Sequence, residues 1–380
     1  MTRVSIVAAK RTPQGRFLGA LARRSAVDLA VAAGRVALEP IGADRVDQVI
    51  IGNVLGAGLG MNIARQIGLA LGVPVDRPAF TVNMMCASGL QAVILAVQAI
   101  AAGQAEVVLC GGTESMSNAP YLLERARAGY RLGDGTLVDC LLRDGLVDPS
   151  SGRHMALTAE RLAAHYQIDR AAQDAFALRS QQLTHRAAAA GRYRDELVVL
   201  KELDADEHPR PDTTLEKLAQ LQPAFQSDGT VTAGNASGVN DGAALLVVCD
   251  ERTAVRHGWA VLATIGPHAA VGCDPAWMGL GPVHATRQLC ERHQLQPGDF
   301  DTVELNEAFA AQTLACIQEL SLELDRVNPD GGAIALGHPI GASGARLVVH
   351  LAQRLARGET KRGLATLCVG GGMGLALVLE

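Results

Sequence analysis

The chain contains an internal repeat, and this repeat limits what it can fold into more than any other feature. Residues 87–103, ASGLQAVILAVQAIAAG, align with residues 342–358, ASGARLVVHLAQRLARG, at a constant offset of 255 positions (87 to 342). Upstream of each segment, DQVIIGNV from Asp47 resembles DTVELNEA from Asp301 at nearly the same offset. Chance similarity between α/β units would not keep this spacing over consecutive elements. The repeat therefore indicates that one structural unit occurs twice in the chain.

Each copy has the pattern of a strand, a loop, a helix and a second strand. After the helices, VVLCGG ends at Gly112 and ATLCVGG ends at Gly371. Short apolar runs of this kind are typical of buried parallel strands. We therefore expect two α/β halves that pack about a pseudo-twofold axis. Apolar residues with helical spacing mark the two helices, namely Leu90, Val93, Ile94 and Val97 in the first copy and Leu347, Val348, Leu351 and Leu355 in the second.

A long insert separates the two copies. We expect an N-terminal α/β half over 1–112, an insert over 113–250 that also carries the remainder of that half, and a C-terminal α/β half over 251–380. The insert contains a helical stretch at 155–190, a polar segment, LDADEHPRPDTTLEKL, and a glycine-rich loop, DGTVTAGNASGVNDG. Long glycine-rich loops on a rigid scaffold often bind ligands, so the insert is expected to help form the functional site.

Composition excludes several classes of partner. Hydrophobic residues make up 48% and charged residues 19%, which allows a large core, and the net charge of −5 argues against nucleic acid. No apolar run approaches the ~18 residues of a membrane span. Lys10 and Arg11 interrupt the first apolar run, which is too short for a signal peptide. We expect a cytoplasmic protein with free thiols, and no metal, because none of the eight cysteines forms a Cys-x-x-Cys pair.

The repeat singles out Cys86 among the cysteines. It precedes the first repeated helix, and its counterpart before the second helix is Gly341, close to His338. About a pseudo-twofold axis, both helix N-termini can face one site. A helix N-terminus lowers the pKa of a thiol, and a nearby histidine could accept its proton. The remaining cysteines outside the C-terminal motif are expected to be inert buried thiols, namely Cys110, Cys140, Cys249, Cys273, Cys290 and Cys316.

Cys368 ends the last repeated strand and meets the sequence VGGGMG. Glycines there let the backbone approach a ligand and expose N–H groups. From residue types alone, a reactive position and an ordinary turn after a core strand are equally good interpretations.

Motifs along nearly the whole chain resemble the thiolase family closely. They are, in order, RTPQGRFLGAL, NMMCASGLQAV, GGTESMSNAPYLL, HMALTAE, VTAGNASGVNDGAA, NEAFAAQ, NPDGGAIALGHPIGASGAR and LCVGGGMG. The resemblance implies an α/β fold with duplicated halves in five layers, α-β-α-β-α, and an inserted loop domain. It also implies acyl-CoA substrates, no separate cofactor, and a dimer or a tetramer built from dimers.

The resemblance assigns roles to five residues. Cys86 corresponds to the nucleophile that accepts the acyl group, and His338 to the base that activates it. Cys368 corresponds to the acid/base that acts on the acetyl-CoA methyl group. Asn306 would hold a water in one oxyanion site, and the N–H groups of Cys86 and Gly370 would form the other. Claisen condensation needs these parts because charge develops on an enolate oxygen.

The resemblance also suggests how coenzyme A is bound. Ala233 and Ser237 match the loop that contacts pantetheine, and Arg210 matches a basic contact to the nucleotide end. A solvated surface arginine is the competing interpretation of Arg210. Residues that match the substrate channel are His154, Met155, Phe225, Met278, Ala308 and Phe309.

Two departures from the family's pattern matter. Met373 replaces a glutamine of the family's last motif, which is expected to alter packing rather than chemistry. The subtype is also mixed, and the segment 193–225 is shorter than in many biosynthetic relatives. GGTESMSNAPYLL resembles short-chain biosynthetic enzymes, whereas AVGCDPAWMGLGPV resembles degradative 3-ketoacyl-CoA thiolases of fatty acid β-oxidation. Two further functions compete with an active thiolase. One is a ketoacyl synthase, against which Cys368 argues, and one is a carrier of acyl-CoA or lipid without activity.

Overall fold

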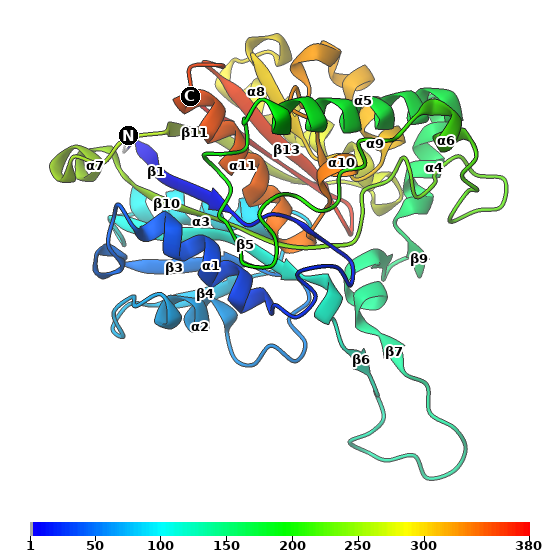
Figure 1. Cartoon of the computed structure of the whole chain (residues 1–380), viewed down its shortest axis with the longest axis horizontal. Coiled ribbons are helices and arrows are strands. Elements are labelled where there is room, and N and C mark those ends of the chain that lie inside the picture. Colours follow the sequence, from blue (N-terminus) through cyan, green and yellow to red (C-terminus); the bar gives the residue numbers. More distant parts are fainter. Residues whose placement is uncertain (1–2) are drawn as a thin grey trace.

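The computed structural model describes residues 3–380, which form one large sheet covered by helices (Figure 1). The strands of the first half are β1 (Val4–Arg11), β2 (Gly15–Arg16), β3 (Gln48–Gly52), β4 (Ala79–Val82), β5 (Val107–Ser115) and β10 (Asn240–Asp250). Those of the second half are β11 (Ala263–Gly272), β12 (Thr302–Leu305), β13 (Gly363–Val369) and β14 (Met373–Leu379). The insert adds β6 (Tyr121–Leu122), β7 (Val138–Asp139), β8 (Val147–Asp148) and β9 (Arg153–His154).

Helices lie before, within and after the insert. The first half has α1 (Ala26–Leu38), α2 (Ile63–Ala70) and α3 (Ser88–Ala101), and the insert has α4 (Ala156–His165), α5 (Arg170–Ala189) and α6 (Leu215–Ala219). The second half has α7 (Glu251–His257), α8 (Gly281–His293), α9 (Ala310–Leu320), α10 (Ala333–Leu336) and α11 (Ile340–Ala356).

The sheet repeats one strand order. In the first half the order is β3-β5-β10-β1, with β4 beyond β3, and in the second half it is β12-β13-β14-β11. The first pair of each series is parallel and the next two pairs are antiparallel. The repeated strands β5 and β13 were expected to pair in parallel. This is correct for their pairing with β3 and β12, and wrong for their pairing with β10 and β14. The halves join where β1 pairs with β11.

Five layers follow from where the helices pack. α3 and α11 lie between the two halves of the sheet and share one apolar cluster with strands of both. α1 and α2 cover the outer face of the first half, and α8 and α9 cover the outer face of the second. This arrangement confirms the α-β-α-β-α fold.

The two central helices contact each other reciprocally. A side chain on Gly89 would place its Cβ 2.9 Å from the Cβ of Ala345, and one on Gly344 would place its Cβ 2.7 Å from the Cβ of Leu90. Gly89 and Gly344 are repeat counterparts, as are Leu90 and Ala345. A contact that recurs with its partners exchanged is the signature of a twofold relation. The expected pseudo-twofold axis therefore passes between α3 and α11.

The insert differs from expectation in one place. The helical stretch at 155–190 is divided into α4 and α5, because Gln167 takes a left-handed conformation with φ of 54°. Asp169 then caps α5 by accepting a hydrogen bond from the N–H of Ala172. β6 and β7 form an arm that extends away from the body (Figure 1).

In the described part of the chain, no helix is long and apolar enough to cross a membrane.

Candidate active site

One cavity of about 120 Å³ brings together three side chains that are far apart in the sequence. Cys86 reaches it from the turn before α3, His338 from the turn before α11, and Cys368 from the end of β13. All three are buried. The helix starts that the repeat predicts to face one another therefore do share a site, although α3 begins two residues after Cys86.

The turn that carries Cys86 is held in an unusual conformation. Met85 has a φ of 47°, in the left-handed region that side chains other than glycine rarely adopt. The Ser88 hydroxyl fixes this turn, because it accepts a hydrogen bond from the N–H of Met84 at 2.9 Å and donates one to the carbonyl of Met85 at 2.6 Å. Strain at such a position is often associated with a functional site.

Burial controls the acidity of Cys86. It raises the pKa of the thiol to about 11, whereas hydrogen bonds from the N–H groups of Gly370 and of Cys86 itself lower the pKa, and the charge of Glu114 raises it. The expectation that the helix start would give a low pKa is therefore wrong in net direction, since the sequence does not reveal the desolvation. The thiol needs a base at neutral pH. Both N–H groups expected to form an oxyanion hole are directed at the Cys86 sulfur.

His338 has the properties of such a base. Burial, and next the charge of Arg346, lower its pKa to about 4, so the imidazole is neutral at physiological pH. Its Nδ1 lies 2.5 Å from the Ser343 Oγ, which itself donates to the carbonyl of Pro339 at 2.9 Å. Because that hydroxyl has only one proton to give, Nδ1 must carry the ring proton. Nε2 is then free to accept a proton.

Cys368 is a second buried thiol with a different environment. Burial raises its pKa well above the usual value, and negative charge on Cys86 raises it further. The two thiols are therefore not thiolates at the same time, as expected if they act in different steps.

Asn306 does not line the cavity, but it lies two residues before Ala308, which does. Its side chain is fully buried, and neither its amide oxygen nor its amide nitrogen forms a hydrogen bond within the described residues. Buried amides normally have partners. An amide that the protein does not satisfy fits the expected role of holding a water molecule.

The residues expected to bind coenzyme A divide between two cavities. Arg210 and Ala233 line a second cavity of about 160 Å³, together with His208 and Lys217. Arg210 is exposed, and its N–H donates to the Gln181 side chain at 2.8 Å. The glycine-rich loop runs from Ala233, beside the second cavity, to the first. Seven expected residues line the cavity of Cys86, namely His154, Met155, Phe225, Ser237, Met278, Ala308 and Phe309.

Sequence reasoning missed several residues that line the cavity of Cys86. They are Met116, Leu146, Ala236, Gly238, Val239 and Ile340. Ala236, Gly238, Val239 and Ile340 lie within two residues of Ser237 or His338, which were predicted, so position within a motif was an available signal. Leu146 ends a π-helical turn, Leu141–Leu146, for which no apolar period could be read.

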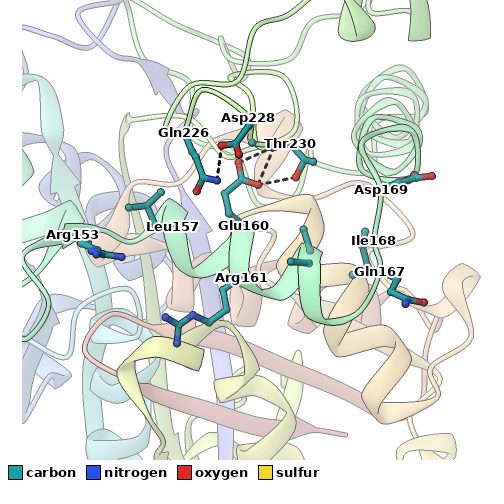
Figure 2. A pocket seen from close by; sticks show the side chains of 13 residues that line it. Arg153, Leu157, Glu160, Arg161, Gln167, Ile168, Asp169, Gln226, Asp228 and Thr230 are labelled. Atoms are coloured by element: carbon teal, nitrogen blue, oxygen red, sulfur yellow. Dashed lines mark hydrogen bonds between the residues drawn. The ribbon is translucent and has the colours of Figure 1, made fainter.

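A larger cavity lies elsewhere. About 710 Å³ in volume, it is formed by α4 and the segment 226–230, and no cysteine or histidine lines it (Figure 2). In it the Glu160 carboxylate accepts hydrogen bonds from the N–H groups of Thr230 and Val231 and from the Thr230 hydroxyl. This contact anchors the start of the glycine-rich loop, so the cavity supports the site rather than containing the chemistry.

Comparison with known proteins matches nearly the whole chain. Residues 4–252 match the family model described as thiolase, N-terminal domain, and residues 259–380 match thiolase, C-terminal domain. Acetyl-CoA acetyltransferase of Pseudomonas aeruginosa is 50% identical over 100% of this chain and 99% of its own length. The protein of the same name from Chromobacterium violaceum is 49% identical, with 99% of each chain covered.

Solved structures agree with these matches. Human mitochondrial 3-ketoacyl-CoA thiolase in complex with CoA superposes with a TM-score of 0.97 at 44% identity, covering 100% of this chain and 98% of that one. Acetyl-CoA acetyltransferase of Bacillus anthracis superposes with a TM-score of 0.97 at 43% identity, covering 100% and 99%.

Proposed function

The chain belongs to the thiolase family, and from that premise we propose that it converts two molecules of acetyl-CoA to acetoacetyl-CoA and CoA, and the reverse, by a ping-pong route. It is an acyltransferase. The observation that carries the proposal for its site is that Cys86, His338 and Cys368 share one buried cavity. Two thiols and a neutral imidazole are the groups that acyl transfer followed by carbon–carbon bond formation requires.

The first half-reaction uses Cys86 and His338. The Cys86 sulfur attacks the thioester carbonyl of acetyl-CoA while His338 Nε2 accepts the thiol proton. The carbon–sulfur bond to coenzyme A breaks, and the leaving thiolate takes that proton as CoA departs. The N–H groups of Cys86 and Gly370, which lower the pKa of the Cys86 thiol in the free protein, would turn to the oxyanion of the tetrahedral intermediate and stabilise it.

The second half-reaction adds Cys368. Cys368 passes its proton to His338, and the resulting thiolate removes a proton from the methyl group of a second acetyl-CoA. The protonated His338, with a water held by Asn306, stabilises the enolate oxygen. The enolate carbon attacks the acyl group on Cys86, the bond from that group to the Cys86 sulfur breaks, and the departing Cys86 thiolate takes the proton from His338, which restores the starting enzyme. Thiolysis follows the same steps in reverse. No cofactor is needed, because the substrate's own thioester supplies the activated carbonyl group.

Coenzyme A is proposed to extend from one cavity to the other. The pantetheine would follow Ser237, Phe225 and His154 toward Cys86, and the nucleotide end would reach Arg210. His154 and Phe225 are stacked with their ring centroids 4.5 Å apart, which forms one wall of the path. A degradative 3-ketoacyl-CoA thiolase acting on longer chains in β-oxidation is the second candidate. The likeness to the human 3-ketoacyl-CoA thiolase favours it.

We further propose a cytoplasmic homotetramer. The eight cysteines are free, as expected in a reducing compartment. The arm of β6 and β7 exposes large apolar side chains, including Tyr121, Leu132 and Leu137. Exposed apolar groups on a projecting arm favour contact with another copy of the chain.

Mass spectrometry after incubation with acetyl-CoA tests the proposal. The expected result is an acetyl adduct on Cys86 that is absent from Cys86→Ser. Binding of CoA without an adduct would identify a carrier instead. Comparing kcat/KM for acetoacetyl-CoA and a longer 3-ketoacyl-CoA then separates the two enzymatic candidates.

A further inference from the structure

Glu114 is a buried carboxylate for which the reaction described above has no use. It lies near the end of β5 and is inaccessible to solvent. Its two oxygens accept four hydrogen bonds, from the Asn53 amide (2.7 Å) and from the N–H groups of Val54 (3.0 Å), Leu55 (3.2 Å) and Gly341 (3.0 Å). These five residues are referred to as the Glu114 clamp. Glu114 therefore contacts both halves of the fold, and the reason for a buried carboxylate at this position needs an explanation.

One side of the clamp leads to the nucleophile. The carbonyl of Val54, whose N–H binds Glu114, accepts a hydrogen bond from the Asn83 amide at 3.4 Å. The Asn83 side-chain oxygen accepts one from the N–H of Met85 at 3.0 Å. Met85 is the residue with φ of 47° that immediately precedes Cys86. Glu114 is thus connected to the nucleophile turn through two hydrogen bonds beyond its own.

The other side leads to the base. Gly341 is the second residue of α11 and lies three positions after His338. A Cβ on Gly341 would lie 2.6 Å from the Glu114 carboxylate and 2.8 Å from the Thr113 carbonyl, so the backbone here approaches too closely for any side chain. The carboxylate also takes up one of the free N–H groups at the start of α11, where negative charge is favourable.

We propose that Glu114 is a positioning residue that fixes the Cys86 turn relative to the His338-bearing start of α11. The inference rests on the proposed roles of these two groups. Cys86 and His338 come from different halves of the chain. A group that binds both segments would hold the thiol and the imidazole at the distance and orientation that proton transfer requires. Even a displacement of about 1 Å at a reacting group can cost roughly 100-fold in rate.

The charge of Glu114 makes this proposal distinguishable from a structural role. Burial raises its pKa to about 7, despite hydrogen bonds that lower it. Its charge raises the pKa of Cys86. The other titratable groups that line the cavity are His154, His338 and Cys368. Removing the charge should therefore make Cys86 more acidic, which taken alone would favour catalysis, while loss of the clamp should make catalysis slower.

The test compares Glu114→Gln with Asp241→Asn. Asp241 is also a buried carboxylate of the first half, but it holds the N–H and hydroxyl of Ser117 rather than either catalytic turn. For Glu114→Gln we expect kcat for thiolysis of acetoacetyl-CoA to fall roughly 10- to 100-fold, with KM for CoA nearly unchanged. The pH midpoint for alkylation of Cys86 by iodoacetamide should move down. In Asp241→Asn that midpoint should stay at the wild-type value.

A wild-type kcat in folded Glu114→Gln, or a loss of kcat without a shift of the alkylation midpoint, would overturn the proposal. If Glu114→Gln does not fold, Asn83→Ala breaks the same chain of hydrogen bonds and must lower kcat. If the proposed function itself is wrong, the wild-type protein forms no acetyl adduct on Cys86. If Glu114→Gln forms the adduct at the same rate as the wild-type protein, the proposed function stands and only the role of the Glu114 clamp is rejected.

Discussion

At the scale of single residues, Cys86 and Cys368 are both buried thiols, yet their surroundings suit different steps. Two N–H groups point at the Cys86 sulfur, which stabilises its thiolate, whereas burial and the neighbouring sulfur keep Cys368 protonated. Cys368→Ala should therefore accept an acetyl group from acetyl-CoA and fail to condense it, with condensation falling by at least about 100-fold. Intact-mass measurement of the acyl-enzyme and a condensation assay check both parts. A folded variant that forms no acyl-enzyme would show that the two steps are not divided in this way.

The preferred length of the substrate's acyl chain is expected to depend on Met155, which lies against the backbone of the candidate active site. Its sulfur is 2.8 Å from where a Cβ on Gly370 would lie, and it shares a small apolar cluster with Met278 and Ala308. Met155→Ala should shift the kcat/KM ratio toward longer 3-ketoacyl-CoAs. The shift should be graded, because each methylene in an apolar pocket is worth about 1–3 kcal/mol. Met61→Ala, at an exposed methionine, is the matched control. An unchanged ratio in Met155→Ala would place the limit of the pocket elsewhere.

Single residues could be predicted where their sequence motif alone indicates the role, and not where the role depends on contacts with distant parts of the chain. The motifs predicted Cys86, His338 and Cys368, and the structure brings the three together. The sign of the Cys86 pKa shift was missed because desolvation comes from side chains distant in sequence. Glu114 was missed for a related reason, since its donors come from two segments distant from it in the sequence, 53–55 and Gly341.

At the scale of elements, α4 positions the glycine-rich loop through one side chain. Glu160 accepts hydrogen bonds from the N–H and the hydroxyl of Thr230 at the start of that loop (Figure 2). It accepts another from the N–H of Val231. Glu160→Ala leaves these donors without a partner, which should cost about 1–3 kcal/mol of stability. Because the loop carries Ala233 and Ser237 to the two cavities, KM for CoA should rise several-fold with little change in kcat. Steady-state kinetics and urea unfolding measure the two effects. A lower kcat at unchanged KM would mean that the loop positions the reacting groups instead.

The sequence predicted the repeated elements well, because their apolar stripes and strand ends are regular. It did not predict the break between α4 and α5, since Gln167 is not a residue type that usually takes a left-handed conformation. The domain boundaries at 112 and 250 stay a prediction. The strand pairing was half right because a buried apolar run looks the same whether its neighbours are parallel or antiparallel.

At the scale of the whole molecule, a buried ionic cluster joins the insert to both halves. His350 of α11 lies 2.8 Å from Glu196 and 3.2 Å from Asp330, while Arg11 of β1 lies 2.6 Å from Glu196. Burial alone would lower the pKa of His350, but Glu196 and then Glu304 raise it to about 9. Burial alone would raise the pKa of Glu196, but His350 and then Arg11 lower it to about 2.

The signs of these shifts fix a pH window for stability. A raised histidine pKa stabilises the fold fully below its unfolded value of about 6.5 and loses that effect as the pH rises through 9. The Glu196 contribution is complete above its unfolded value of about 4.5 and is lost as the pH falls toward 2. His350→Gln should therefore cost about 3 kcal/mol of unfolding free energy near pH 5.5 and progressively less toward pH 9. Urea unfolding at several pH values measures this, and a difference that does not change with pH would contradict it.

The reciprocal contact between α3 and α11 has a consequence for how such a site could have originated. Two identical subunits around a true twofold axis would set like against like, so that Cys86 would face a second cysteine and His338 a second histidine. Joining the copies in one polypeptide frees equivalent positions to diverge. Gly341 occupies the position equivalent to Cys86, and Asn83 occupies the position equivalent to His338, where its side-chain oxygen accepts a hydrogen bond from the N–H of Met85. A duplicated chain can therefore hold one thiol and one imidazole at a single site, whereas a symmetric dimer would have two equivalent sites.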